Sequence, residues 1–172
     1  RGYARSAGTR ETARRLGFCN VVWDSAEEAV ADADLIVLAT PVGVMGHVAE
    51  AIAPHLKPGA TVTDVGSVKR TVIAEVSPHL PDSVHFVPGH PMAGTEHSGP
   101  DAGFASLFDN RWCLIVPVET AREDAVARLE RYWQALGANT ERMDPEHHDL
   151  VCAVVSHIPH LIAYTMVGVA DD

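Results

Sequence analysis

The sequence predicts an α/β protein: a doubly wound, mostly parallel sheet with helices on both faces, followed by the start of an all-α domain. Short β-branched runs alternate with stretches of helical periodicity, and this alternation implies right-handed strand–helix–strand crossovers. From Asp144 onward the chain is helical and apolar, with no further strand-like run. With 172 residues, of which 47% are hydrophobic, the chain is long enough to bury one sizeable core.

Capping residues and β-branched runs set the order of elements in the first half of the chain. Ser25 and Glu28 form a capping box, and the continuous apolar run Asp34–Ala39 suits a strand buried on both faces. In order, we expect a helix over Ala7–Leu16 closed by Gly17, a helix from Ser25 through Ala33, a strand over Asp34–Ala39, a helix over Val42–Leu56 and a strand over Ala60–Val65.

The second half continues this alternation and then changes. In order, we expect a helix from Ser67 to about Ser77, a strand over Val84–Val87, a strand over Trp112–Val118, a helix over Ala121–Leu136 and a strand over Asn139–Met143. Asp144, Pro145 and Glu146 are then an N-cap, a proline at the first helical position and an acid in the first turn. We therefore expect one domain over residues 1–143 and the start of a second over residues 144–172.

The apolar stretch Leu150–Ala170 has about the length of a membrane span. It carries Ser156, His157, Pro159 and His160 near its middle, where polar groups are costly in a bilayer. We therefore expect a helix buried in the second domain and no association with a membrane.

The net charge and the cysteine spacing argue against a nucleic-acid-binding protein, a disulfide-stabilised protein and a cysteine zinc site. The 13 Lys and Arg residues against 23 Asp and Glu give a formal net charge of −10, which repels a phosphate backbone and argues against nucleic acid as a partner. Cys19, Cys113 and Cys152 share no C-x-x-C spacing, which argues against a disulfide framework and a cysteine zinc site. These features favour a reducing compartment, and we expect a cytoplasmic protein.

Two candidate site residues follow buried strands. In open α/β sheets, ligands bind outside the carboxyl ends of the strands, so the loops after Ala39, Val65 and Val87 should line a site. Ser67 is either an N-cap or a hydroxyl polarised by the free N–H groups of a helix N-terminus. His90 stands in a rigid loop rich in Gly and Pro, which is either a surface turn or the holder of a general base.

Two histidines and a serine interrupt the apolar C-terminal helix. His157 and His160 are three residues apart and point roughly the same way, with Ser156 beside them, while Pro159 releases a carbonyl and kinks the helix. They are either a satisfied pair of core histidines or one wall of a polar cleft. Burying these groups without partners is costly, which favours the cleft.

The first residues match the end of the second strand of a Rossmann-like fold. An acid at this point binds the ribose 2′-hydroxyl of NAD, but this chain has Ala4, followed by Arg5, Ser6 and Thr9. That set suits a 2′-phosphate and therefore NADP, and a solvated arginine is the alternative. In this alignment the first strand and its G-x-G-x-x-G turn are missing from the 172 residues.

Together these residues resemble the prephenate/arogenate (cyclohexadienyl) dehydrogenase family of tyrosine biosynthesis. The resemblance covers essentially the whole chain, and four motifs in the right order and spacing make it highly specific. The motifs are Ala39-Thr40-Pro41-Val42, Thr63-Asp64-Val65-Gly66-Ser67-Val68-Lys69, Gly89-His90-Pro91-Met92-Ala93-Gly94-Thr95-Glu96-His97-Ser98-Gly99 and Val155-Ser156-His157-Ile158-Pro159-His160.

The resemblance implies oxidative decarboxylation of prephenate and/or arogenate to 4-hydroxyphenylpyruvate and/or tyrosine, with hydride transfer to NAD(P)⁺. It implies that His90 accepts the proton of the 4-hydroxyl group, with Ser67 beside it. Other residues of the motifs would bind substrate or cofactor. The substrate residues are Thr95, Ser156, His157 and His160, and the cofactor residues are Thr40, Pro41 and Val42, with Ser67 near the nicotinamide. A homodimer is expected of the family, and NADP is preferred here, with NAD possible.

Two rival functions remain. A histidine-ligated metal hydrolase would use some of the ten histidines, but no H-E-x-x-H occurs and His90 stands on a different element from the others, so no metal ligand is assigned. A non-catalytic binding module would keep the fold and lack the nucleotide turn. An intact glycine-rich turn encoded just before Arg1 would remove this second option.

Overall fold

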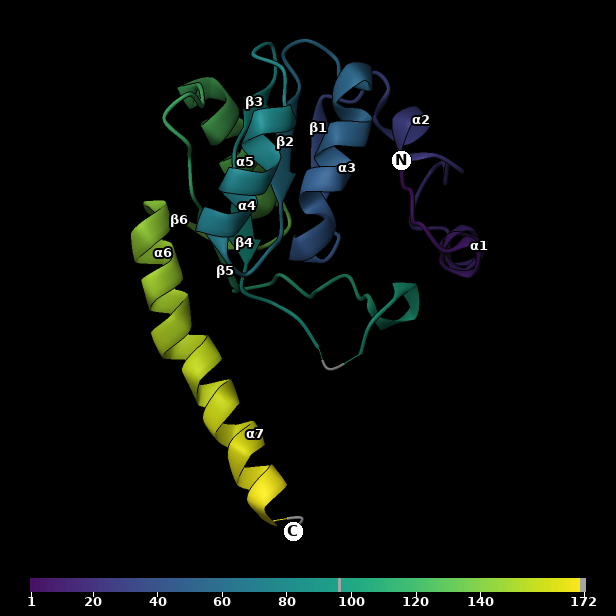
Figure 1. Cartoon of the computed structure of the whole chain (residues 1–172). Coiled ribbons are helices and arrows are strands. Elements are labelled where there is room, and N and C mark those ends of the chain that lie inside the picture. The colour runs from purple at the N-terminus through teal and green to yellow at the C-terminus, as the bar shows by residue number, and fades with distance from the viewer. Residues whose placement is uncertain (96, 171–172) are drawn as a thin grey trace.

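Three short parallel strands form the centre of the molecule. The computed structural model describes the backbone of residues 1–95 and 97–170 (Figure 1). Strands β1 (Leu35–Leu38), β2 (Thr61–Asp64) and β3 (His85–Phe86) lie side by side in that order, and all four residues of β2 are buried. The register joins Leu35 to Thr61 and Val62 to Phe86. The predicted parallel sheet is confirmed.

A second three-stranded sheet follows the first along the chain. Strand β4 (Gly89–Pro91) follows β3 almost directly and pairs antiparallel with β5 (Trp112–Ile115), which pairs parallel with β6 (Asn139–Arg142). His90 lies opposite Leu114 in this ladder. The prediction that the residues after Val87 form a loop is therefore wrong for Gly89–Pro91. These residues form strand β4, because their backbone groups make hydrogen bonds with β5.

Helices cover both faces of the sheet, as a doubly wound fold requires. Helices α3 and α4 lie on one face and α5 lies on the other (Figure 1). The helices of the α/β part are α1 (Ala7–Leu16), α2 (Ala26–Val30), α3 (Met45–Ile52), α4 (Lys69–Val76) and α5 (Glu123–Ala135). Four 3₁₀ turns stand at Val42–Val44, Ala53–His55, Ser77–His79 and Pro100–Ala102. The single helix expected over residues 42–56 is thus an α-helix between two 3₁₀ turns, the second of which contains Pro54.

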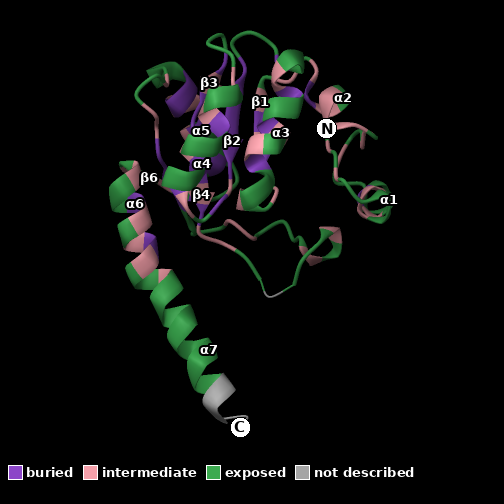
Figure 2. Ribbon diagram, viewed as in Figure 1, coloured by how far each residue is buried: buried purple, intermediate pink, exposed green. Residues whose placement is uncertain are grey.

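The hydrophobic core has two parts. One lies under α2, α3 and α4 and includes Met45, Val62 and Val72, and the other lies between β5 and α5 and includes Ile115 and Trp133. Figure 2 shows this burial as a purple centre within a green exterior. The α/β part therefore has its own packed interior on both sides of the sheet.

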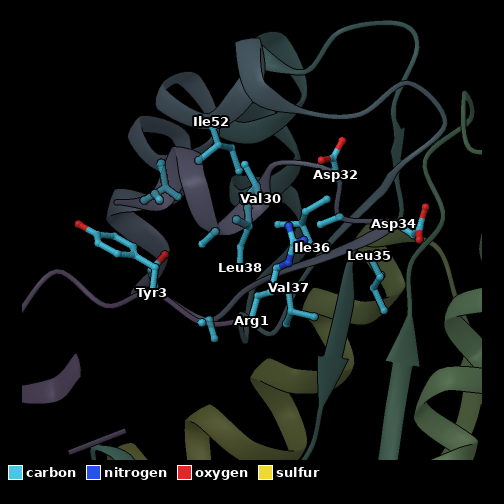
Figure 3. Close-up of a pocket in the computed structure, with 17 residues that line it drawn as sticks. Arg1, Tyr3, Val30, Asp32, Asp34, Leu35, Ile36, Val37, Leu38 and Ile52 are labelled. Atoms are coloured by element: carbon cyan, nitrogen blue, oxygen red, sulfur yellow. The ribbon is translucent and has the colours of Figure 1, made fainter. Parts of the chain in front are cut away.

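The N-terminal residues stand apart from β1 and leave a cavity. Gly2 forms a parallel bridge with Val22, and a cavity of about 580 Å³ separates Gly2 and Tyr3 from residues 35–40 (Figure 3). Its wall is mostly apolar and includes Val30, Leu38 and Ile52. In a doubly wound sheet, the first strand lies between these two segments. The cavity therefore has the position that the first strand of such a sheet occupies.

The C-terminal helix extends away from the α/β part. It consists of α6 (Pro145–Cys152), a π-helical turn over Ala153–His157 and α7 (Ile158–Ala170) (Figure 1). The expectation of a buried helix is wrong for the described residues, because large apolar side chains from Leu150 to Val167 are exposed. Within the described part of the chain, α6 packs against α4, whereas α7 continues from the π-helical turn with exposed side chains. By length and composition alone, Pro145–Val167 could cross a membrane.

Candidate active site

A buried ion pair fixes the edge of the sheet at which the site residues gather. Asp64 ends β2, Lys69 begins α4, and the two side chains form an ion pair with no exposure to solvent. The ammonium group of Lys69 also donates to the carbonyl of Gly89 at 2.7 Å, and the N–H of Gly66 donates to Asp64 at 2.8 Å. Burial raises the pKa of Asp64 and lowers the pKa of Lys69, because both charges leave water. The start of β4 and the loop that carries Ser67 are thereby held at one edge.

His90 faces a second histidine across the gap between the sheet and α6. Nδ1 of His90 lies 3.0 Å from Nε2 of His148, and Nδ1 of His148 lies 2.8 Å from Oδ1 of Asp149. A carboxylate only accepts hydrogen bonds, so Nδ1 of His148 carries a proton and its Nε2 is an acceptor. Nδ1 of His90 is therefore the donor in the histidine pair. The remaining nitrogen of His90, Nε2, keeps a free lone pair.

Burial keeps this pair of imidazoles neutral. The pKa of His90 is lowered to about 4, first by burial and then by the neighbouring His148, Lys69 and His157. The pKa of His148 is also lowered by burial, although the carboxylate of Asp149 works in the opposite direction. Burial acts to raise the pKa of Asp149 too, but the hydrogen bonds from Lys69 N–H and His148 outweigh it and the pKa lies below its usual value. At neutral pH the group is thus two neutral rings beside one carboxylate.

Cys152 completes the cluster from one turn further along α6. Its Sγ lies 3.6 Å from Nδ1 of His90 and 3.6 Å from Nε2 of His148, and the side chain is fully buried. Burial raises the pKa of this thiol. His148 and Cys152 are four residues apart and therefore share one face of the helix. That face packs against His90.

The structure rejects the N-cap interpretation of Ser67. Helix α4 begins at Lys69, two residues later, and Val68 at its N-cap position makes no side-chain hydrogen bond. Instead, the carboxylate of Asp149 accepts from the N–H groups of Lys69 at 2.7 Å and Arg70 at 3.1 Å. A carboxylate from α6 thus satisfies the N-terminus of α4. Ser67 is exposed, and its hydroxyl makes no hydrogen bond with another described residue.

The predicted substrate residues lie further from the core. His157 and His160 are exposed and Ser156 is half-buried, in and just after the π-helical turn. The turn ends two residues before Pro159, whose missing N–H removes one α-helical hydrogen bond. Thr95 is exposed in the loop after β4, where its hydroxyl bonds to the backbone of His97. The charge of His157 acts to lower the pKa of His90.

The predicted cofactor residues flank the cavity and the first helix. Ser6 is the N-cap of α1, since its hydroxyl accepts from the N–H of Thr9 at 3.4 Å, and Arg5 beside it is exposed. Thr40 lines the cavity, and its buried hydroxyl oxygen has no hydrogen-bond partner among the described residues. An unsatisfied hydroxyl at the carboxyl end of a parallel strand fits a polar ligand there. Pro41 is exposed and Val42 is half-buried beside it.

Sequence reasoning missed the residues that support His90. Asp64 and Lys69 belong to a motif that was singled out for Ser67, and His148 and Cys152 share a helical face that the spacing of four reveals. Nothing local in the sequence indicates that this face meets His90, which is 58 residues away in the chain. The spacing of histidines and cysteines along the sequence does not reveal that His90, His148 and Cys152 lie together.

Comparison with known families identifies the chain's relatives. The model of the prephenate dehydrogenase nucleotide-binding domain matches residues 1–142, and the model of the prephenate dehydrogenase dimerization domain matches residues 144–172. The chain belongs to the prephenate dehydrogenase family. The resemblance seen in the four motifs is confirmed.

Individual relatives agree with this assignment. The cyclohexadienyl dehydrogenase of Zymomonas mobilis is 43% identical over 169 residues, which are 98% of this chain and 57% of that protein. The prephenate dehydrogenase of Bacillus subtilis is 35% identical over 156 residues, which are 90% of this chain and 42% of that protein. The chain thus spans about half the length of the curated relatives it matches.

Solved structures of the family superimpose closely. Prephenate dehydrogenase from Aquifex aeolicus in complex with hydroxyphenyl propionate and NAD⁺ matches with a TM-score of 0.89 and 32% identity, covering 98% of this chain and 58% of that chain. Arogenate dehydrogenase from Synechocystis matches with a TM-score of 0.86 and 29% identity, covering 98% of this chain and 59% of that chain. The Rossmann-like fold expected from the sequence is confirmed.

Proposed function

We propose that the chain is part of an NAD(P)-dependent prephenate/arogenate dehydrogenase, with a dinucleotide-binding domain over residues 1–143 and the start of a helical substrate and dimerisation domain over residues 144–172. The reaction is oxidative decarboxylation of prephenate and/or arogenate to 4-hydroxyphenylpyruvate and/or tyrosine. Membership of the family supports this proposal. The observation that carries it is the neutral, oriented imidazole of His90 at the carboxyl edge of the sheet.

His90 acts on the 4-hydroxyl group of the substrate. Its Nε2 accepts the hydroxyl hydrogen, since its Nδ1–H is donated to His148. As the proton moves to Nε2, positive charge develops on the ring, and His148 and the carboxylate of Asp149 stabilise it along the hydrogen-bonded chain. The low pKa of His90, about 4, keeps the acceptor nitrogen unprotonated before the reaction.

Loss of this proton is coupled to loss of hydride from the same carbon, which builds a carbonyl, and loss of CO₂ then makes the ring aromatic. When bound, the nicotinamide cofactor supplies the hydride acceptor. Aromatisation supplies the driving force, so the work of the protein is orientation and hydrogen bonding. His90 and Ser67 are the residues we assign to this work, and the exposed hydroxyl of Ser67, which caps no helix, supports its part.

The remaining assignments concern binding. Ser156, His157, His160 and Thr95 hold the ring and side-chain carboxylates, and the electrostatic effect of His157 on His90 supports its inclusion. Thr40, Pro41 and Val42 contact the cofactor, with the unsatisfied hydroxyl of Thr40 as the supporting observation. Ser67 lies near the nicotinamide.

The choice between cofactors rests on the start of the chain. Arg5, Ser6 and Thr9 surround the N-terminus of α1, a favourable position for a 2′-phosphate, and Arg5 forms no ion pair with another described residue. We therefore propose NADP as the preferred cofactor, with NAD also possible. Comparison of kcat/KM for the two cofactors tests this preference, and a strong preference for NAD would refute it.

The assembly and location follow from the same family. We propose a homodimer formed through the C-terminal domain, which the exposed apolar face of α7 and the matched dimerization domain support. Three free cysteines fit a reducing compartment, and we propose the cytoplasm.

The test is an assay of the complete gene product with both acids and both cofactors, following absorbance of the reduced nicotinamide. Turnover of prephenate or arogenate with one cofactor is the expected result. Cofactor binding without turnover of either acid would contradict the enzyme and favour a non-catalytic binding module.

A further inference from the structure

Three metal-ligand atoms from two elements converge at one point beside the sheet. They are Nδ1 of His90, Nε2 of His148 and Sγ of Cys152, and all lie within 4.8 Å of one another. Their separations are 3.0 Å between the nitrogens and 3.6 Å from the sulfur to each nitrogen. A tetrahedral zinc site with Zn–N of about 2.0–2.1 Å and Zn–S of about 2.3 Å places its donor atoms about 3.3–3.6 Å apart. The two imidazoles need to separate by only a few tenths of an ångström.

The tautomer of His148 is already that of a ligand. Asp149 accepts from Nδ1–H of His148, so the lone pair of Nε2 faces the cluster. Metal-binding histidines are commonly held in this way by a carboxylate that does not itself bind the metal. Asp149 is fixed in turn by the N–H groups of Lys69 and Arg70. The outer support of a metal site is therefore built into the fold.

The surrounding charges suit a divalent cation. The nearby ammonium group of Lys69 is paired with Asp64, which leaves the carboxylate of Asp149 as a negative charge beside the cluster. Deprotonation of Cys152 adds a second negative charge, and a coordinating metal drives that deprotonation. One dication thus balances the thiolate and the carboxylate. Two imidazoles and a thiolate favour a borderline-soft ion such as Zn²⁺ over Mg²⁺ or Ca²⁺.

We propose that His90, His148 and Cys152 form a binding site for Zn²⁺ or a similar transition-metal ion. Binding releases the thiol proton of Cys152 to solvent and breaks the His90–His148 hydrogen bond. A neutral imidazole with a metal on Nδ1 carries its proton on Nε2, so His90 changes from an acceptor to a donor at the nitrogen that faces substrate. The consequence for catalysis rests on the proposed function: with a donor in place of the acceptor, His90 no longer takes the hydroxyl proton, and the ion inhibits the dehydrogenase.

The test of binding uses Co²⁺ as a spectroscopic probe in the metal-free complete gene product. We expect one equivalent to give visible bands of tetrahedral cobalt and a thiolate-to-cobalt charge-transfer band, both displaced by Zn²⁺. Cys152→Ser should abolish the charge-transfer band, whereas Cys19→Ser, the matched control at a half-buried thiol outside the cluster, should keep it. Absence of the band, or its persistence in Cys152→Ser, would overturn the proposal.

Two further variants test the geometry. His148→Gln should weaken cobalt binding strongly, and His147→Gln, at the exposed neighbouring residue, should not. Asp149→Asn should weaken it by about 10–100-fold, the range for loss of an outer carboxylate. Melting of each metal-free variant checks its fold, and Cys152→Ala replaces Cys152→Ser if a buried hydroxyl unfolds the chain. Equal binding by both histidine variants would contradict the site.

Inhibition is measured separately from binding. In the active enzyme, Zn²⁺ should lower turnover with an inhibition constant equal to the Kd for Zn²⁺ derived from its competition with Co²⁺, and a chelator should restore turnover. An enzyme that binds cobalt through Cys152 and is not inhibited would refute the tautomer change only. A gene product without dehydrogenase activity would refute the proposed function, while the cobalt spectrum still decides the metal site.

Discussion

The two ends of the C-terminal helix differ in burial and in their contacts with the rest of the chain. In α6, His148 and Cys152 are fully buried against β4, and Asp149 caps α4. In α7, which continues the same helix, the apolar side chains from Ile158 to Val167 are exposed (Figure 2). One face of α6 is thus packed into the protein interior, whereas no described residue covers the apolar side chains of α7.

The two ends also differ in what orients their histidines. At the buried end, tautomers, pKa directions and caps follow from distances within this chain, so the role of His90 can be argued from geometry. At the exposed end, His157 and His160 take their roles from the family motif, because no described contact orients them. The following predictions test whether this division between the two ends is real.

Substitution of His90 should have the largest effect. We expect His90→Asn to lower kcat by about 10²–10⁴-fold and leave cofactor affinity nearly unchanged, as loss of a general base does. At the exposed end, His160→Asn should mainly raise KM for the acid, and the exposed His79→Asn serves as the surface control. Steady-state kinetics of the complete gene product provide both constants. Equal loss of kcat in the His90 and His160 variants would contradict the assignment of a catalytic role to His90 and a binding role to His160.

The pH dependence of stability should report the buried imidazoles. Their pKa values in the folded protein are lowered, to about 4 for His90, so between that value and about 6.5 the unfolded chain binds more protons. Their contribution is therefore complete above about pH 6.5 and is lost as the pH falls, at up to about 1.4 kcal/mol per pH unit for each ring.

Denaturant unfolding at a series of pH values measures this slope. The variant His148→Gln should reduce the slope of the curve below about pH 6.5, because one of the two buried rings is removed, and His147→Gln, at the exposed neighbour, provides the comparison. If the wild-type curve is flat over this window, the two rings are not buried in neutral form.

Loss of the carboxylate that joins two helices should have a smaller effect. Asp149→Asn keeps the shape of the side chain but removes a charged acceptor of two backbone N–H groups and one imidazole, and we expect a loss of about 1–3 kcal/mol in the free energy of unfolding. Asp144→Asn is the matched control, because Asp144 caps only its own helix and Asn caps about as well as Asp. Equal losses of unfolding free energy in the two variants would show that Asp149 does not stabilise the contact between α4 and α6.

The sequence predicted what depends on local pattern and missed what depends on tertiary contact. The strands around Val62 and Ile115 follow from β-branched runs, and the gathering of Ser67 and His90 at one edge follows from the common direction of parallel strands. Ser67 has the residue type of an N-cap, but the distant Asp149 takes that role. Burial of the helix after Cys152 required a packing partner, and no periodicity reveals whether one is present.

The smallest effect on stability is expected from substitution of an exposed apolar side chain in α7. Leu161 is 67% exposed and Leu129 is 1% exposed, so the same substitution can be compared at both. Leu129→Ala should lower the free energy of unfolding of residues 1–172 by about 2–5 kcal/mol, because it opens a cavity between β5 and α5. In a single, unassociated copy of residues 1–172, Leu161→Ala should change it by no more than about 0.5 kcal/mol, because the Leu161 side chain is exposed there. Urea unfolding of the two variants gives both values. A large loss at Leu161 would mean that α7 is covered in solution, which a second copy docked on this face would produce, and it would then depend on protein concentration.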